Sequence, residues 1–95
     1  MQAIDISKKA ETFKFLGDPT RLKILAVLFS TDEELCVNEI SDAVDASPSA
    51  TSHQLAKLEV RNIVTSIRDG QTMCYKVIDS SVTDELRAII NLWYE

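Results

Sequence analysis

The sequence contains few of the residues that mark secreted, membrane-spanning or loop-rich proteins. Its 95 residues include only two cysteines, two glycines and two prolines. Two cysteines far apart in the chain are too few for the disulfide framework of a small secreted domain. No apolar run approaches the roughly 20 residues that span a bilayer, and the N-terminus has no apolar signal-peptide core. We therefore expect a cytoplasmic protein that does not enter a membrane.

The sequence also has no motif of a common enzyme class. It contains no nucleophile elbow, no glycine-rich phosphate loop and no second histidine to join His53 in a metal site. Cys36 and His53 are the one conventional pair of nucleophile and base, and they fall on different predicted elements. These observations predict a protein that is not an enzyme, with no cofactor and no small-molecule substrate.

The apolar content of 45% is sufficient for one hydrophobic core, so residues 1–95 are expected to form a single domain. The net charge is −5, but the charges are unevenly distributed. Both terminal segments are acidic. Residues 46–78 are instead basic, with Lys57, Arg61, Arg68 and Lys76 against Glu59 and Asp69. This distribution lets a polyanion bind the middle segment, while the acidic flanks limit nonspecific association.

Apolar spacing predicts five helices and a β-hairpin. The predicted helices cover residues 7–16, 19–29, 38–44 and 48–61, and a last one follows Ser80 or Ser81; the predicted strands cover residues 35–37, 63–68 and 72–78. In the first helix, Ala10, Phe13 and Leu16 lie at helical spacing. The two hairpin strands are joined around Asp69-Gly70, a strong turn signal. This order is typical of a winged helix-turn-helix, a mainly α fold with a small β-hairpin wing.

The helix predicted for residues 48–61 has a polar side that suits DNA. On a helical projection Leu55 centres the buried side, which also holds Pro48, Thr51, Leu58 and Glu59. The opposite side carries short or neutral polar side chains that fit a major groove and hydrogen-bond base edges, with basic residues for the phosphates. The predicted DNA-binding residues are Ser49, Ala50, Ser52, His53, Gln54, Lys57 and Arg61, with Arg68, Gln71 and Thr72 on the hairpin.

Two other interpretations of this helix stay open. One is an ordinary amphipathic helix whose polar side is solvated. The other is a winged helix that binds a protein, because the fold does not require DNA, and the net charge of −5 supports this alternative. Acidic or apolar residues on the outward side would favour a protein partner. The residues present there favour DNA.

Four segments occur in a characteristic order along the chain. They are LGDPTRLKIL at residues 16–25, ELCV at 34–37, SATSHQLAKL at 49–58, and the hairpin that contains Gly70 and ends in Tyr75. Together they resemble the ArsR/SmtB family of bacterial transcriptional repressors over residues 10–95. The resemblance implies a homodimer that binds an inverted-repeat operator in double-stranded DNA. It implies that Ser49, Ser52, His53 and Gln54 read DNA, and that Arg68 and the wing contact the backbone or minor groove.

The resemblance also implies that the first and last helices form the dimer interface. Independently, the last helix carries an apolar stripe in a chain too small to cover it completely, which favours a two-fold partner. The alternative is that this stripe packs only on the core of its own chain. The predicted interface residues are Phe13, Val82, Leu86, Ile89, Ile90 and Trp93.

The family's metal sites are incomplete in this chain. In metal-responsive members one site uses two cysteines, where this chain has Cys36 and Asn38. A second site pairs carboxylates with histidines, where this chain keeps Asp79 and Glu95 but neither histidine. Soft metals need several thiolate or imidazole ligands. We therefore expect no metal effector, with an atypical metal site that includes Cys36 and Glu39 as the alternative.

Cys36 and Cys74 are candidates for a thiol switch. Cys36 lies in the predicted short strand and Cys74 in the second hairpin strand, and these strands are neighbours in winged helices. Their sulfur atoms could therefore come within disulfide range. Oxidation would then couple the wing to the start of the DNA-reading motif. The alternative is that both are small buried apolar residues, as free cysteines often are.

Overall fold

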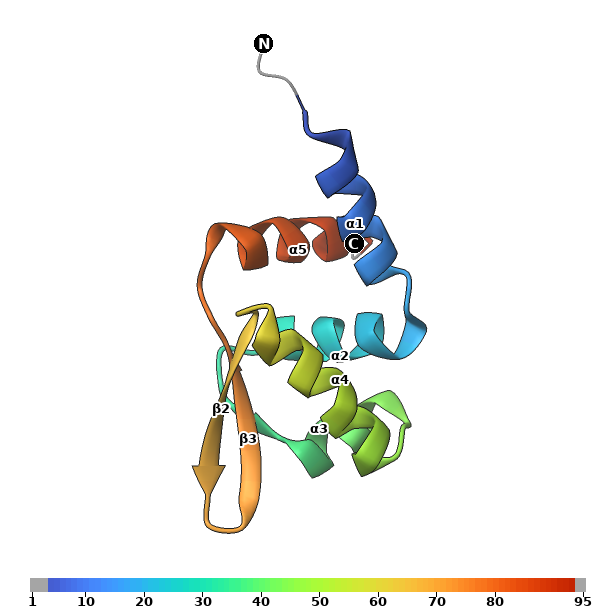
Figure 1. The fold of residues 1–95 in the computed structure, drawn as a ribbon. Helices are drawn as coiled ribbons and strands as arrows, with labels where there is room; N and C mark the ends of the chain where they lie inside the picture. The colour runs from blue at the N-terminus through green and yellow to red at the C-terminus, as the bar shows by residue number, and fades with distance from the viewer. Residues whose placement is uncertain (1–3, 94–95) are drawn as a thin grey trace.

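The computed structural model describes residues 4–93, which contain five helices and three strands (Figure 1). The elements are α1 (Ile6–Leu16), α2 (Pro19–Phe29), β1 (Leu35–Cys36), α3 (Val37–Val44), α4 (Pro48–Val60), β2 (Val64–Asp69), β3 (Thr72–Val77) and α5 (Ser81–Asn91). This order confirms the predicted winged helix-turn-helix. No helix in the described part of the chain is long and apolar enough to cross a membrane.

The centre of the molecule is α2, which is fixed at its start by the sequence Asp18-Pro19. The Asp18 carboxylate accepts a hydrogen bond from the backbone N–H of Arg21 at 2.9 Å, and Pro19 occupies the first turn, where its missing N–H is tolerated. Ile24, Leu25 and Leu28 follow at helical spacing and are all buried. They form the core on which α3, α4 and the sheet pack.

Helices α3 and α4 form the helix-turn-helix. Asp45 ends α3 in the left-handed conformation (φ 55°), and the N–H of Ala46 donates to the carbonyl of Ser41 at 3.1 Å. Two residues later Ser47 caps α4 by accepting the backbone N–H of Ala50 at 3.0 Å. Because both helix ends are satisfied within this short turn, α4 begins at a defined position and angle.

The three strands form an antiparallel sheet in the order β1-β3-β2. In the hairpin Asp69 pairs with Thr72, so Gly70 and Gln71 form the turn. Gly70 has φ +65°, which glycine adopts without strain. On the other edge of β3, Leu35 pairs with Tyr75 and Cys36 with Cys74. The hairpin extends beyond the helices at one end of the molecule (Figure 1).

Helix α5 packs on the core through Leu86 and Ile90, which are 3% and 1% exposed. These two residues were predicted at a dimer interface. In the single chain both side chains pack on their own core, and a role at a dimer interface stays a prediction for them. Val82 and Trp93, by contrast, are 53% and 62% exposed, and Ile89 is half-buried. The apolar stripe is therefore divided between the core and the surface.

Helix α1 projects from the rest of the chain (Figure 1). It begins at Ile6 rather than Ser7, because Asp5 supplies the N-cap by accepting the N–H of Lys8 at 3.2 Å. Only Phe15 and Leu16 are buried in it. Ala10 and Phe13 are exposed, Phe13 by 65%, so this side of the helix does not pack on the core of its own chain. Apolar spacing predicts a helix face but not what covers it, and this face is uncovered in the single chain.

Thr51 carries a buried hydroxyl at a tightly packed position of α4. Its side chain is fully buried, and its Oγ1 has no hydrogen-bond partner within residues 4–93. An unsatisfied buried hydroxyl costs stability, whereas a methyl group of the same shape does not. We expect Thr51→Val to leave the free energy of unfolding unchanged or to raise it by about 1 kcal/mol. Urea denaturation followed by circular dichroism measures this change, and a loss of more than about 1 kcal/mol would show that the hydroxyl is bonded.

Candidate nucleic-acid interface

Helix α4 has one fully buried and one exposed face. Thr51, Leu55 and Leu58 are 0% exposed and lie against the core. Opposite them, Ser49, His53, Lys57 and Val60 are all exposed, as the helical projection predicted. Ala50 and Arg61 are also exposed, and Ser52 is half-buried at the margin. The predicted contact residues of α4 therefore lie on or beside one continuous exposed face.

The remaining predicted contacts lie on the wing. Arg68, Gln71 and Thr72 are exposed at the tip of the hairpin, around the turn that Gly70 makes possible. The hairpin and α4 are the two elements that a winged helix presents to a duplex. The structure thus places all ten predicted contact residues on α4, the residue after it, and the wing tip.

Gln54 is held by a residue that sequence reasoning missed. The Arg21 side chain donates from Nε to Gln54 Oε1 at 3.1 Å and from Nη1 to the carbonyl oxygen of Phe15 at 2.7 Å. It therefore joins the end of α1, the start of α2 and the middle of α4. No sequence signal connects Arg21 with Gln54, because 33 residues separate them. Because the bond occupies the amide oxygen, Gln54 keeps its NH₂ group as a hydrogen-bond donor.

The start of α2 is stabilised by the negative charge of its N-cap residue, Asp18. The backbone N–H of Arg21 bonds the Asp18 carboxylate and so lowers the pKa of Asp18, and the positive charges of Arg21 and Lys57 lower it further. Asp18 is therefore ionised at neutral pH. The N-cap of α2 therefore stays in place at neutral pH.

The end of α4 is tied to the wing. Asn62 adopts the left-handed conformation (φ 60°), and the N–H of Ile63 donates to the Leu58 carbonyl at 3.0 Å, which ends the helix sharply. Glu59, predicted on the buried side, is exposed instead, as is Pro48. The Glu59 carboxylate accepts the backbone N–H and the hydroxyl of Ser66 on β2. The only acid of α4 is thereby directed to the wing and away from the exposed polar face.

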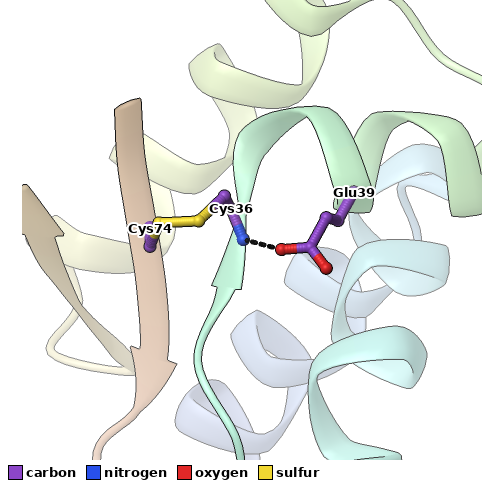
Figure 2. The surroundings of a disulfide bond; sticks show 3 residues. All are labelled: Cys36, Glu39 and Cys74. Atoms are coloured by element: carbon purple, nitrogen blue, oxygen red, sulfur yellow. Dashed lines mark hydrogen bonds between the residues drawn. A yellow bond between two sulfur atoms is a disulfide. The ribbon is translucent and has the colours of Figure 1, made fainter. Parts of the chain in front are cut away.

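Cys36 and Cys74 are joined by a disulfide bond (Figure 2). They face each other across the β1–β3 pair, Cys74 fully buried and Cys36 half-buried. Cys36 is also the residue before α3, and its backbone N–H donates to Glu39 Oε1 at 3.0 Å. The bond therefore links the first residue of the helix-turn-helix to the inner strand of the wing.

Three of the residues at the positions of the family's metal sites lie in the described part of the chain. The sulfur of Cys36 is bonded to Cys74 and is not a free thiolate, and Asn38 offers only an amide. Asp79 is exposed, and Glu95 lies outside the described residues. Within residues 4–93 there is no group of three or more His, Cys, Asp or Glu side chains that could hold a metal.

Comparison with known proteins gives a consistent result. The model of a family described as "Bacterial regulatory protein, arsR family" matches residues 18–66. The cadmium resistance transcriptional regulatory protein CadC of Listeria innocua is 37% identical over 79 residues, which are 83% of this chain and 66% of that protein. The SmtB homologue of Synechocystis, a transcriptional repressor, is 36% identical over 80 residues, 84% of this chain and 59% of that protein. The chain thus spans less than two thirds of the length of these relatives.

Solved structures resemble the whole described fold. One is the solution structure of the homodimeric winged helix-turn-helix DNA-binding domain of Mb0332 from Mycobacterium bovis, a possible ArsR-family regulator. It superposes with a TM-score of 0.70 at 25% sequence identity, covering 92% of this chain and 78% of that chain. The similarity includes the helices beside the helix-turn-helix as well as the motif itself.

The disulfide should contribute to stability. It closes a loop with a sequence separation of 38 residues and so restricts the unfolded chain. We expect dithiothreitol to lower the free energy of unfolding by about 2–4 kcal/mol, measured by urea denaturation of the oxidised and reduced chains. The double variant Cys36→Ser/Cys74→Ser is the control and should show no effect of the reductant. Equal stability of the two forms of the natural chain would contradict this role.

Proposed function

The chain belongs to the arsR family of bacterial regulatory proteins, and from that membership we propose that it is a transcriptional repressor that binds duplex DNA sequence-specifically. The observation that carries the proposal is the division of α4 into two faces. Its buried face fixes the rotation of the helix, and its exposed face presents Ser49, His53 and Lys57. These side chains suit base edges and phosphates in a major groove.

The electrostatics of α4 support the same function. Glu59, the one carboxylate of the helix, is bonded to Ser66 on the wing. Lys57 and Arg61 are exposed, and Arg68 extends the positive charge to the wing tip. A helix between two phosphate walls needs this distribution, because an acid on the groove side would be repelled. His53 and Ser49 are then the residues that read bases, and the basic residues set position.

We propose further that the repressor is a homodimer on an inverted repeat. Most of α1 is exposed, although an isolated helix of 11 residues is marginal in water. Phe13, Val82 and Trp93 are exposed apolar residues on α1, at the start of α5 and just after α5. Trp93 also lines an apolar cavity of about 440 Å³ with Leu22, Ala26 and Ile90. In this proposal a two-fold partner covers these surfaces, and the dimer places its two α4 helices on two half-sites. The similar Mb0332 domain is a homodimer, which supports the proposal.

Substitution of base-reading and phosphate-binding residues should have different effects. The probe is a duplex selected from a random library by the natural chain. His53→Ala should reduce the preference for the selected duplex over a scrambled one by roughly tenfold for each chain of the dimer, the value of one good base contact. Arg68→Ala should weaken binding to both duplexes alike and lower the salt slope by about two, one for each chain of the dimer. Fluorescence anisotropy at several salt concentrations measures both quantities.

Lys8→Ala removes an exposed charge from α1 and serves as the control, with no expected effect on either quantity. Sedimentation of the complex gives its stoichiometry, expected as two chains per duplex. If the natural chain enriches no duplex sequence, the repressor function is wrong and a winged helix that binds a protein is favoured.

The regulatory signal that the structure supports best is a change in thiol state. The disulfide connects the start of α3 with β3, so it holds the helix-turn-helix and the wing in one arrangement. In the reduced chain only the two residue pairs of β1 with β3 join these strands directly. Oxidation removes two protons and two electrons from the two thiols; a hydroperoxide accepts them and becomes an alcohol and water. In a reducing compartment a disulfide of this kind forms only transiently, so its formation can signal the presence of an oxidant.

Oxidation should therefore strengthen operator binding. If the reduced chain holds the competent arrangement for about 10–30% of the time, its apparent affinity falls roughly three- to tenfold. Anisotropy titrations of the oxidised and reduced chain at one salt concentration measure this ratio. The Cys36→Ser/Cys74→Ser variant should bind with one affinity under both conditions. Equal affinity of the two forms of the natural chain, or tighter binding of the reduced form, would contradict the switch.

A further inference from the structure

Beside the exposed face of α4 lies a concave site that we call the Phe15 cleft, formed by Phe15, Arg21, Lys57 and Arg61. The guanidinium carbon atoms of Arg21 and Arg61 lie over the Phe15 ring, 4.3 and 4.2 Å from its centroid. A cavity of about 430 Å³ lined by all four residues continues along α4 to His53. A second cavity of about 430 Å³ shares Phe15, Arg21 and Arg61 and continues to Lys14.

Within residues 4–93 no cation of the cleft forms a salt bridge, although the charges of Arg21 and Lys57 both act on the Asp18 carboxylate. The chain has 15 acidic and 10 basic side chains, so acidic partners are plentiful. Yet the one salt bridge in the part of the chain that the structure describes joins Lys9 and Glu85, on α1 and α5. The only carboxylate that lines either cavity is Glu11, beside Lys14. Cations that gather at a concavity and outnumber the acids beside them favour an anionic ligand.

The two arginines are already held in place. Arg21 uses two of its five N–H donors for the carbonyl of Phe15 and the amide oxygen of Gln54, which leaves three for a ligand. Arg61 is stacked on the aromatic ring, which restricts its side chain without occupying any of its donors. A preorganised guanidinium loses little conformational entropy when it binds a phosphate, and it can bind two oxygens at once.

We propose that the Phe15 cleft binds one backbone phosphate of the duplex, next to the groove that α4 enters. The proposal rests on the proposed DNA-binding function and extends the contact surface from α4 to the end of α1 and the start of α2. Its position follows from His53 and Lys57, which line the cleft and also belong to the exposed face of α4. A helix in the major groove is flanked by phosphates, and the cleft opens on that flank.

The test compares Arg61→Gln with a matched control. Arg87 on α5 also lies over an aromatic ring, that of Phe29, at 4.9 Å, so Arg87→Gln removes the same charge and the same kind of stacking elsewhere. Arg61→Gln should weaken binding roughly three- to tenfold for each chain of the dimer, on selected and scrambled duplexes alike, and lower the salt slope by about 1.8, because the dimer loses two phosphate contacts. Arg87→Gln should change neither. Phe15→Leu keeps the charges but removes the aromatic ring on which Arg21 and Arg61 stack. It should weaken DNA binding with little change in the salt slope.

A neutral-phosphate scan locates the contact. One methylphosphonate is placed at successive backbone positions of the selected duplex. We expect one position per half-site at which the neutral group weakens binding of the natural chain but not of Arg61→Gln, because the two changes remove the same contact. Circular dichroism of each variant confirms that the fold is kept.

The possible results are separable. If Arg61→Gln matches the natural chain while His53→Ala loses sequence preference, the cleft proposal is wrong and the repressor function stands. If inorganic phosphate binds in an Arg61-dependent way but the salt slope of DNA binding is unchanged, the cleft is a site for the free anion and the proposal is overturned. If the natural chain binds no duplex, the proposed function itself fails.

Discussion

The rotation of α4 about its own axis is the constraint on which the rest of the structure depends. Thr51, Leu55 and Leu58 have no exposed surface, so the helix cannot turn by even one residue without exposing apolar side chains or burying polar ones. That burial determines which residues face outward, and His53 is among them. The same packing leaves the Thr51 hydroxyl without a hydrogen-bond partner among the described residues, and such a group lowers the stability of the fold.

The wing is held relative to α4 from two sides. On one side Glu59 bonds Ser66 on β2, and the Asn62 turn brings the chain directly from the helix into that strand. On the other side β1 and the disulfide attach β3 to the start of α3. Buried Tyr75, whose pKa is raised by burial and by the charge of Glu59, lies between these two connections. A change at either connection therefore alters how α4 and the wing are presented together.

A chain with a net charge of −5 can still bind a polyanion, because the field at the contact surface depends on where the charges lie. Here the acid of α4 is directed to the wing, and cations that form no salt bridge within residues 4–93 gather at Phe15 and along the outer face of α4. The acidic excess lies elsewhere, in the loop before β1 and in α5 among other places. Local arrangement, and not composition, determines the partner that this surface can accept.

The sequence by itself determined the features that depend on neighbouring residues: the capped start of α4 at Ser47 and Pro48, its two faces, the hairpin turn at Gly70, and the order of elements that indicates a winged helix. Local periodicity is enough for these features, because each arises within a few residues. Only the tertiary structure decided which apolar residues are covered: Leu86 and Ile90 enter the core, whereas Phe13, with the same helical signal, is exposed. It also decided the bond of Arg21 to Gln54, the stacking on Phe15 and the joining of Cys36 to Cys74. Each of these contacts joins residues on separate elements, and periodicity along a chain carries no information about which elements meet.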